Sequence, residues 1–239
     1  MFNYDINNLK EKLSVIIGDN ISTAAFHWMK THGVSDSAKV FKGNFSQVPQ
    51  RVGKSTVILS AAQSEQLKAI RPKFTIDQWT ADKLCRVYLL ISMDCIKEDK
   101  YFQLIEDLFS VAEMNEQVSL YSALPVLPYP ELWDKRCAEG IRSNIGSVLE
   151  AIMYRNPYPA EQLDEAAWNQ MVLKAFFMDK QVRQIQGLDE RANKELTRIL
   201  TDYAKERKTA GRSVNTMLWY LVGKHVDATV LDRMKQGIF

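Results

Sequence analysis

Cysteine is scarce in this sequence of 239 residues, and its three cysteines, Cys85, Cys95 and Cys137, lie far apart. Their number is odd and no two have the close spacing of a C-x-x-C metal or redox site. The sequence therefore argues against a disulfide framework. Because the surroundings of these residues are apolar or helical, it predicts reduced, buried thiols.

Long apolar runs are also lacking. No uninterrupted stretch approaches the roughly 20 apolar residues that a helix needs to cross a bilayer. The first ten residues, MFNYDINNLK, lack the basic start and apolar core of a secretory signal. We therefore expect no transmembrane segment and a cytoplasmic location.

Neither sign of charge dominates, since 31 Lys and Arg residues face 29 Asp and Glu residues, for a formal charge of +2. Such a balance gives no strong field for nucleic acid or anionic lipid, and we expect no nucleic-acid partner. Residues 180–212 are locally basic, with nine basic and five acidic residues. We interpret that excess as the solvated faces of helices.

The usual catalytic signatures are incomplete. The segment Gly53–Thr56 reads GKST, like the end of a P-loop, but Val48 stands where the upstream glycine belongs. His27, His32 and His225 lack an acidic residue three positions earlier, so the paired Glu-x-x-His motif of di-iron bundles is absent. There is no DDxxD or GxSxG motif either. We expect no metal and no other cofactor.

Apolar residues at helical spacing are plentiful, in a chain that is 46% hydrophobic. One apolar stripe runs from Phe2 to Ile17 and another continues to Gly33, which predicts a helical hairpin. Ser60 with Gln63, and Thr75 with Gln78, have the spacing of capping boxes that begin further helices.

The sequence makes a specific structural prediction for each of three longer segments. Residues 34–60 contain Gly43, Pro49 and Gly53 without a sustained helical period, so we interpret them as an ordered connection. Residues 130–152 keep helical spacing through Gly140, which predicts one helix. Residues 166–178 are apolar nearly all round, which predicts a central helix wrapped by its neighbours.

The predicted fold class is therefore all-α. Successive helices with short turns indicate an antiparallel helical array, either a compact bundle or a short, curved stack resembling an α-solenoid. We expect a single helical domain over residues 1–239 that ends in a weakly amphipathic tail, residues 226–239.

Polar residues inside apolar helices are the main candidates for a site. Lys174 is the only charged residue in its helical stretch, and Asn169 lies near it; Arg142, Asn144 and Glu150 interrupt the apolar period further upstream. Burying such groups requires partners. They could form an internal network that holds helices in register, a cleft for an anionic or hydroxyl-rich molecule, or a protein interface.

Several segments resemble the EboA family, and together they span about residues 40–223. The most specific are Asn156–Ala160 (NPYPA), Trp168–Phe177 (WNQMVLKAFF), Gly187–Asn193 (GLDERAN) and Asp202–Arg207 (DYAKER), followed by Ala210–Arg212 and Trp219. Arg51–Lys54, Trp79–Leu90, Leu120–Pro128 and Arg142–Asn144 extend the match. With the polar members of these motifs, the candidate ligand-binding residues are Arg142, Asn144, Glu150, Asn156, Asn169, Lys174, Arg191 and Asn193.

The resemblance implies a place in a bacterial and algal gene cluster associated with making or exporting a cyclitol-like or other secondary metabolite, including export of the scytonemin precursor. Other members of such clusters resemble a prenyltransferase, a sugar phosphate cyclase, a sugar isomerase, a metal-dependent hydrolase and a phosphatase. It implies no catalytic residue for this chain.

Two functions follow as hypotheses. The leading one is a non-catalytic accessory or binding protein that supports biosynthesis or export of a metabolite precursor, with a small polar or anionic metabolite and proteins of the same cluster, prenyltransferase-like or sugar phosphate cyclase-like, as partners. The alternative is an isomerase or transferase acting on a sugar phosphate or cyclitol. It would use Lys174 or Glu150 as acid or base and Arg142 and Arg191 as anion contacts.

Overall fold

The computed structural model describes residues 3–35, 37–95 and 97–239, and within these ranges every regular element is a helix. Two isolated bridges, Thr56 with Thr80 and Tyr154 with Ile185, are the β pairing found there. The prediction of an all-α fold is confirmed. Contacts divide the chain into two compact units, Met1–Ile152 and Met153–Phe239, which are described separately. The prediction of a single domain is not tested by this division and stays a prediction.

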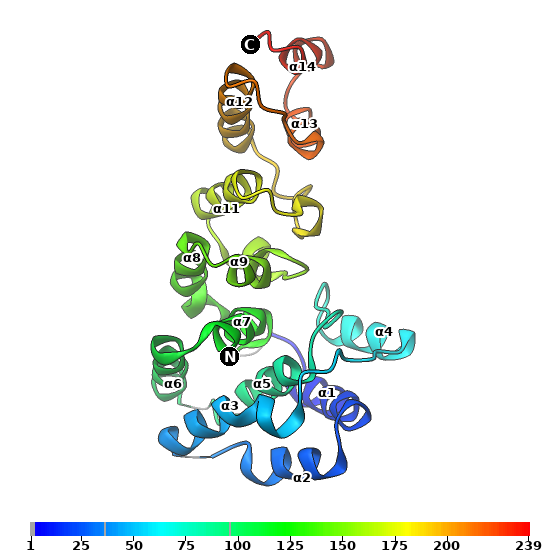
Figure 1. The fold of residues 1–239 in the computed structure, drawn as a ribbon, viewed down its shortest axis with the longest axis vertical. Helices are drawn as coiled ribbons and strands as arrows, with labels where there is room; N and C mark the ends of the chain where they lie inside the picture. Colours follow the sequence, from blue (N-terminus) through cyan, green and yellow to red (C-terminus); the bar gives the residue numbers. More distant parts are fainter. Residues whose placement is uncertain (1–2, 36, 96) are drawn as a thin grey trace. The chain divides into compact units, whose positions relative to one another are not determined.

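The first unit is built around one helix, α5, of which ten of the twelve residues are buried. Helices α1, α3 and α7 pack against it (Figure 1). The helices of this unit are α1 (Ile6–Asn20), α2 (Thr23–His32), α3 (Ala38–Val52), α4 (Ala61–Ile70), α5 (Ala81–Ser92), α6 (Glu98–Val111), α7 (Met114–Ala123), α8 (Asp134–Arg142) and α9 (Gly146–Met153), with short 3-10 turns η1 (Leu124–Val126) and η2 (Pro130–Trp133).

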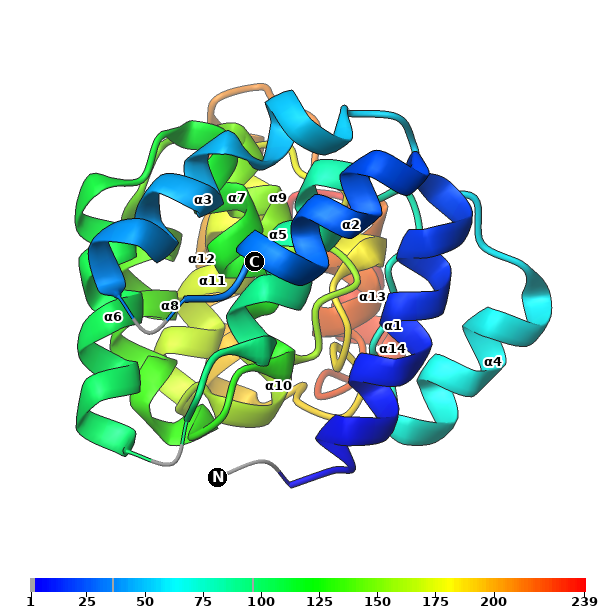
Figure 2. The same cartoon turned by 90° about the horizontal axis from the view of Figure 1, so that it is seen from below.

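The N-terminal hairpin is confirmed as α1 and α2, and its apolar stripe buries Leu9, Leu13, Ile16 and Ile17. Phe2, which the sequence places in the same stripe, lies outside the described residues. Helix α4 flanks α1, as Figure 2 shows from below. The predicted capping box of Ser60 and Gln63 begins α4, and its Gln63 also donates to Asp19 Oδ2 of α1 at 3.0 Å.

The interpretation of residues 34–60 as an ordered connection without a sustained helical period is wrong, because Ala38–Val52 form helix α3. Phe41, Phe45, Val48 and Val52 follow helical spacing and are buried on one face. Pro49 sits inside the last turn and has no N–H, which leaves the carbonyl of Phe45, four residues earlier, without its helical donor. Apolar packing and a substitute donor maintain the helix despite the proline.

The substitute donor is Arg86 of α5, whose Nε donates to the carbonyl oxygen of Phe45 at 3.1 Å. The same guanidinium lies 3.5 Å from Asp82 Oδ2 and 3.7 Å from Glu116 Oε1 of α7. Arg86, Asp82 and Glu116 are 3%, 5% and 7% exposed. One buried cation therefore joins α3, α5 and α7.

Two further expectations are wrong. The single helix through Gly140 is interrupted at Ser143, whose backbone is extended and whose Oγ accepts from the amide of Ile145 at 3.0 Å, so α8 ends and α9 begins separately. Thr75 and Gln78 form no capping box, because α5 begins after Thr80 and Gln78 has a positive φ of 63°. At Ser143 a local hydrogen bond outweighs the apolar period.

The second unit is a succession of helices in which each packs against the next: α11 on α12, α12 on α13 and α13 on α14 (Figure 1). Its helices are α10 (Tyr158–Gln162), α11 (Glu165–Phe177), α12 (Lys194–Thr209), α13 (Thr216–Val222) and α14 (Ala228–Lys235), with a 3-10 turn η3 (Val182–Gln184). Helix α11 leaves Ala166, Gln170 and Phe177 exposed, so the prediction of a central helix wrapped by its neighbours is wrong for that face. Within the described residues, α5 comes nearest to that description.

Candidate functional site

The segment Gly187–Asn193 forms a tight loop that precedes α12 in the second unit. Gly187 has a φ of 81°, and a Cβ added to it would lie 2.6 Å from Ala160 Cβ. Only glycine therefore fits, for its left-handed backbone and for its close approach to α10. The amide of Arg191 closes the loop by donating to the carbonyl of Gly187 at 2.9 Å.

Arg191 lies against the end of α10. Its Nη1 donates to the carbonyl oxygens of Leu163 at 2.8 Å and Pro159 at 3.1 Å, and its guanidinium lies 4.8 Å from the centre of the Trp168 ring. Burial lowers the pKa of Arg191, while the charges of Asp164 and Glu165 raise it. These contacts bind the loop to α10 and α11.

Asn193 is the N-cap of α12, and its Oδ1 accepts from the amide of Leu196 at 2.7 Å. Its Nδ2 donates to Asn169 Oδ1 of α11 at 2.9 Å, and Asn169 Nδ2 donates in return to Asn193 Oδ1 at 3.2 Å. Asn169 is 1% exposed. The paired amides hold α11 and α12 in register.

The other predicted site residues are placed differently. Asn156 is buried, and its Oδ1 accepts from the amide of Tyr158 at 3.0 Å in a turn that opens α10. Lys174 is partly buried on α11, and burial lowers its pKa. Arg142, Asn144 and Glu150 belong to the first unit, and their side chains are exposed. Of the predicted residues, the structure brings together Asn169, Arg191 and Asn193.

The first half of the same loop faces the surface. Asp189 Oδ1 accepts a hydrogen bond from Tyr220 Oη at 2.7 Å and forms an ion pair with Lys224 Nζ at 2.6 Å. These contacts lower the pKa of Asp189, chiefly through the hydrogen bond from Lys224, and the partner carboxylate raises the pKa of Lys224. Asp189 is therefore a fixed negative charge near neutral pH.

Tyr220 lies between two hollows and is 50% exposed. One hollow, of about 370 Å³, is lined by Arg183, Leu188, Asp189, Glu190 and Met217 among others. The other, of about 590 Å³, lies between α13 and α14 and is lined by Trp219, Lys224, Leu231 and Lys235 among others. Both volumes fall in the range of small-molecule sites.

This surface offers three kinds of contact. The Tyr220 ring, over which Lys224 Nζ lies at 5.1 Å from the centre, gives an aromatic face. Arg183, Lys224 and Lys235 supply positive charge, while Asp189 and Glu190 supply acceptors. We call Arg183, Asp189, Tyr220, Lys224 and Lys235 the Tyr220 site. Such a surface can hold a ring that has apolar faces and polar or anionic substituents.

Sequence reasoning did not single out Tyr220 or Lys224. Asp189 lies within the GLDERAN segment, whose pattern assigns it no role, and Tyr220 stands in the apolar run Met217–Leu221, where an aromatic residue suggests core packing. The available signal was a tyrosine with a lysine four positions later, Tyr220 in the last turn of α13 and Lys224 in the turn that follows it. Only the fold brings that pair to Asp189.

A metal site, a membrane span and a P-loop were sought in the part of the chain that the structure describes. No group of His, Cys, Asp and Glu residues that could hold a metal ion occurs there. None of the helices described is both long and apolar enough to span a membrane. The GKST segment runs from the end of α3 into the bridge with Thr80, where the carbonyl of Ser55 accepts from the amide of Ala81 at 2.8 Å.

Residues 9–223 match a protein family described as "Metabolite traffic protein EboA". No curated protein and no solved structure matches the chain. The matched residues include the Asn169–Asn193 pair and, from the Tyr220 site, Arg183, Asp189 and Tyr220. It covers most of the 239 residues, and the chain therefore belongs to the EboA family.

Proposed function

We propose that this protein is a non-catalytic helical binding protein of an ebo-type gene cluster. It binds a small polar or anionic metabolite in the cytoplasm and supports the biosynthesis or export of a cyclitol-like or other secondary metabolite precursor. Its protein partners in this proposal are the prenyltransferase-like and sugar phosphate cyclase-like members of the same cluster. The family description, which names metabolite traffic, supports this role.

The observation that carries the proposal is the setting of Tyr220. Its ring is half-exposed between two hollows, while its hydroxyl is fixed on Asp189 at 2.7 Å and Lys224 is fixed on the same carboxylate. An aromatic ring held in this way is preorganised, so little conformational freedom is lost when a ligand stacks on it. A hydroxyl-rich or phosphorylated ring has an apolar face for Tyr220 and polar edges for the charged groups beside it.

The electrostatics favour binding over proton transfer at this site. An effective general base has a pKa near the working pH. Lys224 and Tyr220 instead hold the pKa of Asp189 below its usual value of 3.8, so the carboxylate accepts protons poorly near pH 7. Its contribution is to orient Tyr220 and Lys224.

The test is to purify the protein from a strain with the intact cluster and to identify the small molecules released on denaturation by mass spectrometry. Wild-type protein and Tyr220→Phe, which keeps the ring, should retain a polar metabolite that Tyr220→Ala loses. Ile58→Ala removes an 81% exposed apolar side chain from the first unit and serves as the matched control, with retention unchanged.

Binding of myo-inositol and glucose 6-phosphate to the purified protein, measured by calorimetry, provides a second readout with the same variants. The proposal is wrong if Tyr220→Ala retains the metabolite and binds both probes as wild type does. Turnover of a phosphorylated cyclitol by the purified protein alone would equally overturn it, in favour of an enzyme.

A further inference from the structure

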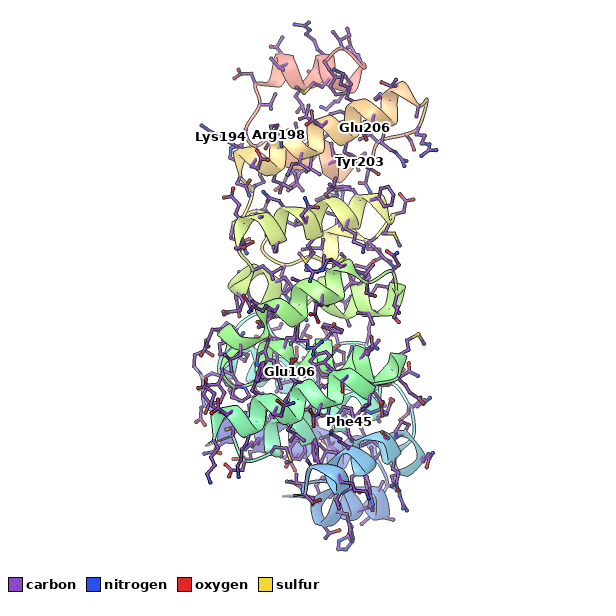
Figure 3. All side chains as sticks on the ribbon, turned by 90° about the vertical axis from the view of Figure 1, so that its left-hand side faces the viewer. Phe45, Glu106, Lys194, Arg198, Tyr203 and Glu206 are labelled. Carbon is purple, nitrogen blue, oxygen red and sulfur yellow. The ribbon has the colours of Figure 1, made fainter. Side chains whose placement is uncertain are left out.

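A third hollow in the second unit has different chemistry. It has a volume of about 450 Å³ and is lined by Phe177, Asp179, Tyr203, Glu206, Arg207, Ala210 and Arg212. These residues come from the C-terminal end of α11 and the C-terminal half of α12. Figure 3 shows Tyr203 and Glu206 on that half of α12, while Lys194 and Arg198 mark its opposite end. We call this hollow the Phe177 pocket.

Its apolar wall is unusually open to solvent. Phe177 is the last residue of α11 and is 67% exposed, although burial of a phenylalanine side chain is favourable. Tyr203 lines the same hollow, and its hydroxyl donates to the carbonyl of Phe176 at 3.3 Å, which fixes its ring. The pocket therefore presents two aromatic side chains to a ligand.

Its cationic wall is Arg207. Nε of this residue donates to the carbonyl of Ser213 at 3.0 Å, and the guanidinium carbon lies 5.9 Å from the centre of the Tyr203 ring. Within the described residues, Arg207 has no carboxylate partner, and the two Nη groups make no hydrogen bond there. A guanidinium anchored through Nε leaves its Nη groups free to bind a carboxylate.

A capping motif closes the end of α12 beside the pocket. Gly211, with a φ of 68°, ends the helix in a Schellman motif, in which Arg212 N donates to the carbonyl of Arg207 at 2.8 Å and Gly211 N to that of Lys208 at 2.9 Å. These bonds fix the backbone of Arg212, which lines the pocket as a second positive charge.

The charged side chains that line the pocket favour a monoanion over a dianion. Asp179 and Glu206 line the pocket together with Arg207 and Arg212, so two carboxylates oppose two guanidinium groups. A phosphate dianion would meet repulsion from both carboxylates, whereas a single carboxylate can sit on Arg207. A zwitterion can also direct its ammonium group to the acidic residues.

We infer that the Phe177 pocket is a binding site for an aryl carboxylate, a ligand whose aromatic ring packs on Phe177 and Tyr203 while its carboxylate binds the Nη groups of Arg207. Simple aryl acids and aromatic amino acids share this chemistry. The site uses none of the residues of the Tyr220 site, so it is independent of the function proposed above.

The experiment measures dissociation constants of the full chain by calorimetry for 3-phenylpropionate and L-phenylalanine, which distinguish the two sources. Acetate carries the carboxylate without the ring, benzyl alcohol carries the ring without the carboxylate, and inorganic phosphate is a different anion. The aryl carboxylate should bind at least tenfold more tightly than acetate, benzyl alcohol or phosphate, because only it contacts both the aromatic side chains and the guanidinium of Arg207.

Phe177→Ala and Arg207→Gln should each weaken binding of 3-phenylpropionate at least tenfold. Arg207→Lys should weaken it less, because lysine keeps the charge but lacks the planar guanidinium. Arg198→Gln is the control, since Arg198 is exposed on the same helix and pairs with Glu195 and Asp202. Tyr220→Ala should also leave this affinity unchanged, which separates the two sites.

Circular dichroism establishes that each variant is folded before it is compared. Two results would overturn the inference: tighter binding of phosphate than of 3-phenylpropionate, or wild-type affinity in both Phe177→Ala and Arg207→Gln. Failure of 3-phenylpropionate and L-phenylalanine to bind the wild-type protein at millimolar concentration would do so as well.

Discussion

Nε of Arg86 donates to the carbonyl oxygen of Phe45 at 3.1 Å, which is the oxygen that the backbone of Pro49 cannot bond. A side chain from α5 thus completes a helical turn of α3. Phe45 is labelled on α3 in Figure 3. The arrangement explains how a helix accommodates an internal proline next to a core, because the unpaired carbonyl is buried together with its donor.

Replacing Arg86 by Met should destabilise the protein by about 3 to 5 kcal/mol, because Asp82 and Glu116 would remain buried without their cation. Urea unfolding followed by circular dichroism measures this loss. Adding Asp82→Asn and Glu116→Gln should recover a large part of it, since the stranded charges are then removed.

The role of Pro49 is tested in the same background. Pro49→Ala returns an N–H to α3, so the carbonyl of Phe45 regains a helical donor. The loss caused by Arg86→Met should therefore be smaller with Pro49→Ala than without it, by about 1 kcal/mol, the usual net value of a hydrogen bond. Strict additivity of the two substitutions would contradict this relationship.

The amide pair of Asn169 and Asn193 should contribute more to the free energy of unfolding than an exposed helix cap does. Asn193→Ala removes both the cap of α12 and the partner of a buried amide, and we expect a loss of about 2 to 4 kcal/mol. Asn215→Ala removes the exposed cap of α13 alone and should cost about 1 kcal/mol. Equal losses in thermal unfolding would show that the pair with Asn169 contributes nothing.

Substitutions at Gly187 and Gly211 distinguish the effect of backbone strain from that of steric crowding. Both have positive φ, 81° and 68°, but an added Cβ meets Ala160 Cβ at 2.6 Å only at Gly187, and nothing within 4 Å at Gly211. Gly211→Ala should cost about 1 kcal/mol from its backbone conformation. Gly187→Ala should cost at least about 2 kcal/mol more, because overpacking adds to the strain. Unfolding midpoints that shift equally would rule out the steric part.

Lys83 should make stability depend on pH. It lies 4.5 Å from the centre of the Trp79 ring, and burial lowers its pKa to about 8 from 10.5, although the charge of Asp82 opposes the shift. Between pH 8 and 10.5 the unfolded chain therefore binds more protons than the folded one at this position. The contribution of Lys83 to stability is lowest below pH 8 and rises as pH increases through this window.

The variant Lys83→Met isolates that contribution from other titrating groups. Its advantage over wild type in free energy of unfolding should shrink between pH 8 and 10.5, by on the order of 1 to 2 kcal/mol after allowance for partial exposure. Urea unfolding at pH 7, 8, 9 and 10 measures the difference. Parallel curves for the two proteins across this range would contradict the lowered pKa.

Local patterns predicted much of the secondary structure. The stripe of α1 and the capping box of Ser60 and Gln63 depend on residues within one or two turns, so their signals are contained in the sequence. Helix α3 was not predicted because Pro49 normally signals a break, and the side chain that replaces its N–H belongs to Arg86, 41 positions from the accepting Phe45. The break at Ser143 was missed because a hydroxyl and an amide two residues apart outweighed an apolar period.

The sequence by itself determined the helical class and the polar segment Gly187–Asn193, because periodicity, capping and glycine conformation are local properties. Only the tertiary structure decided what that segment does. It places Asn193 against Asn169 and Asp189 against Tyr220 and Lys224, pairs separated by 24, 31 and 35 positions. Such pairings depend on how helices pack, and no local pattern encodes which distant side chain an amide or carboxylate will meet.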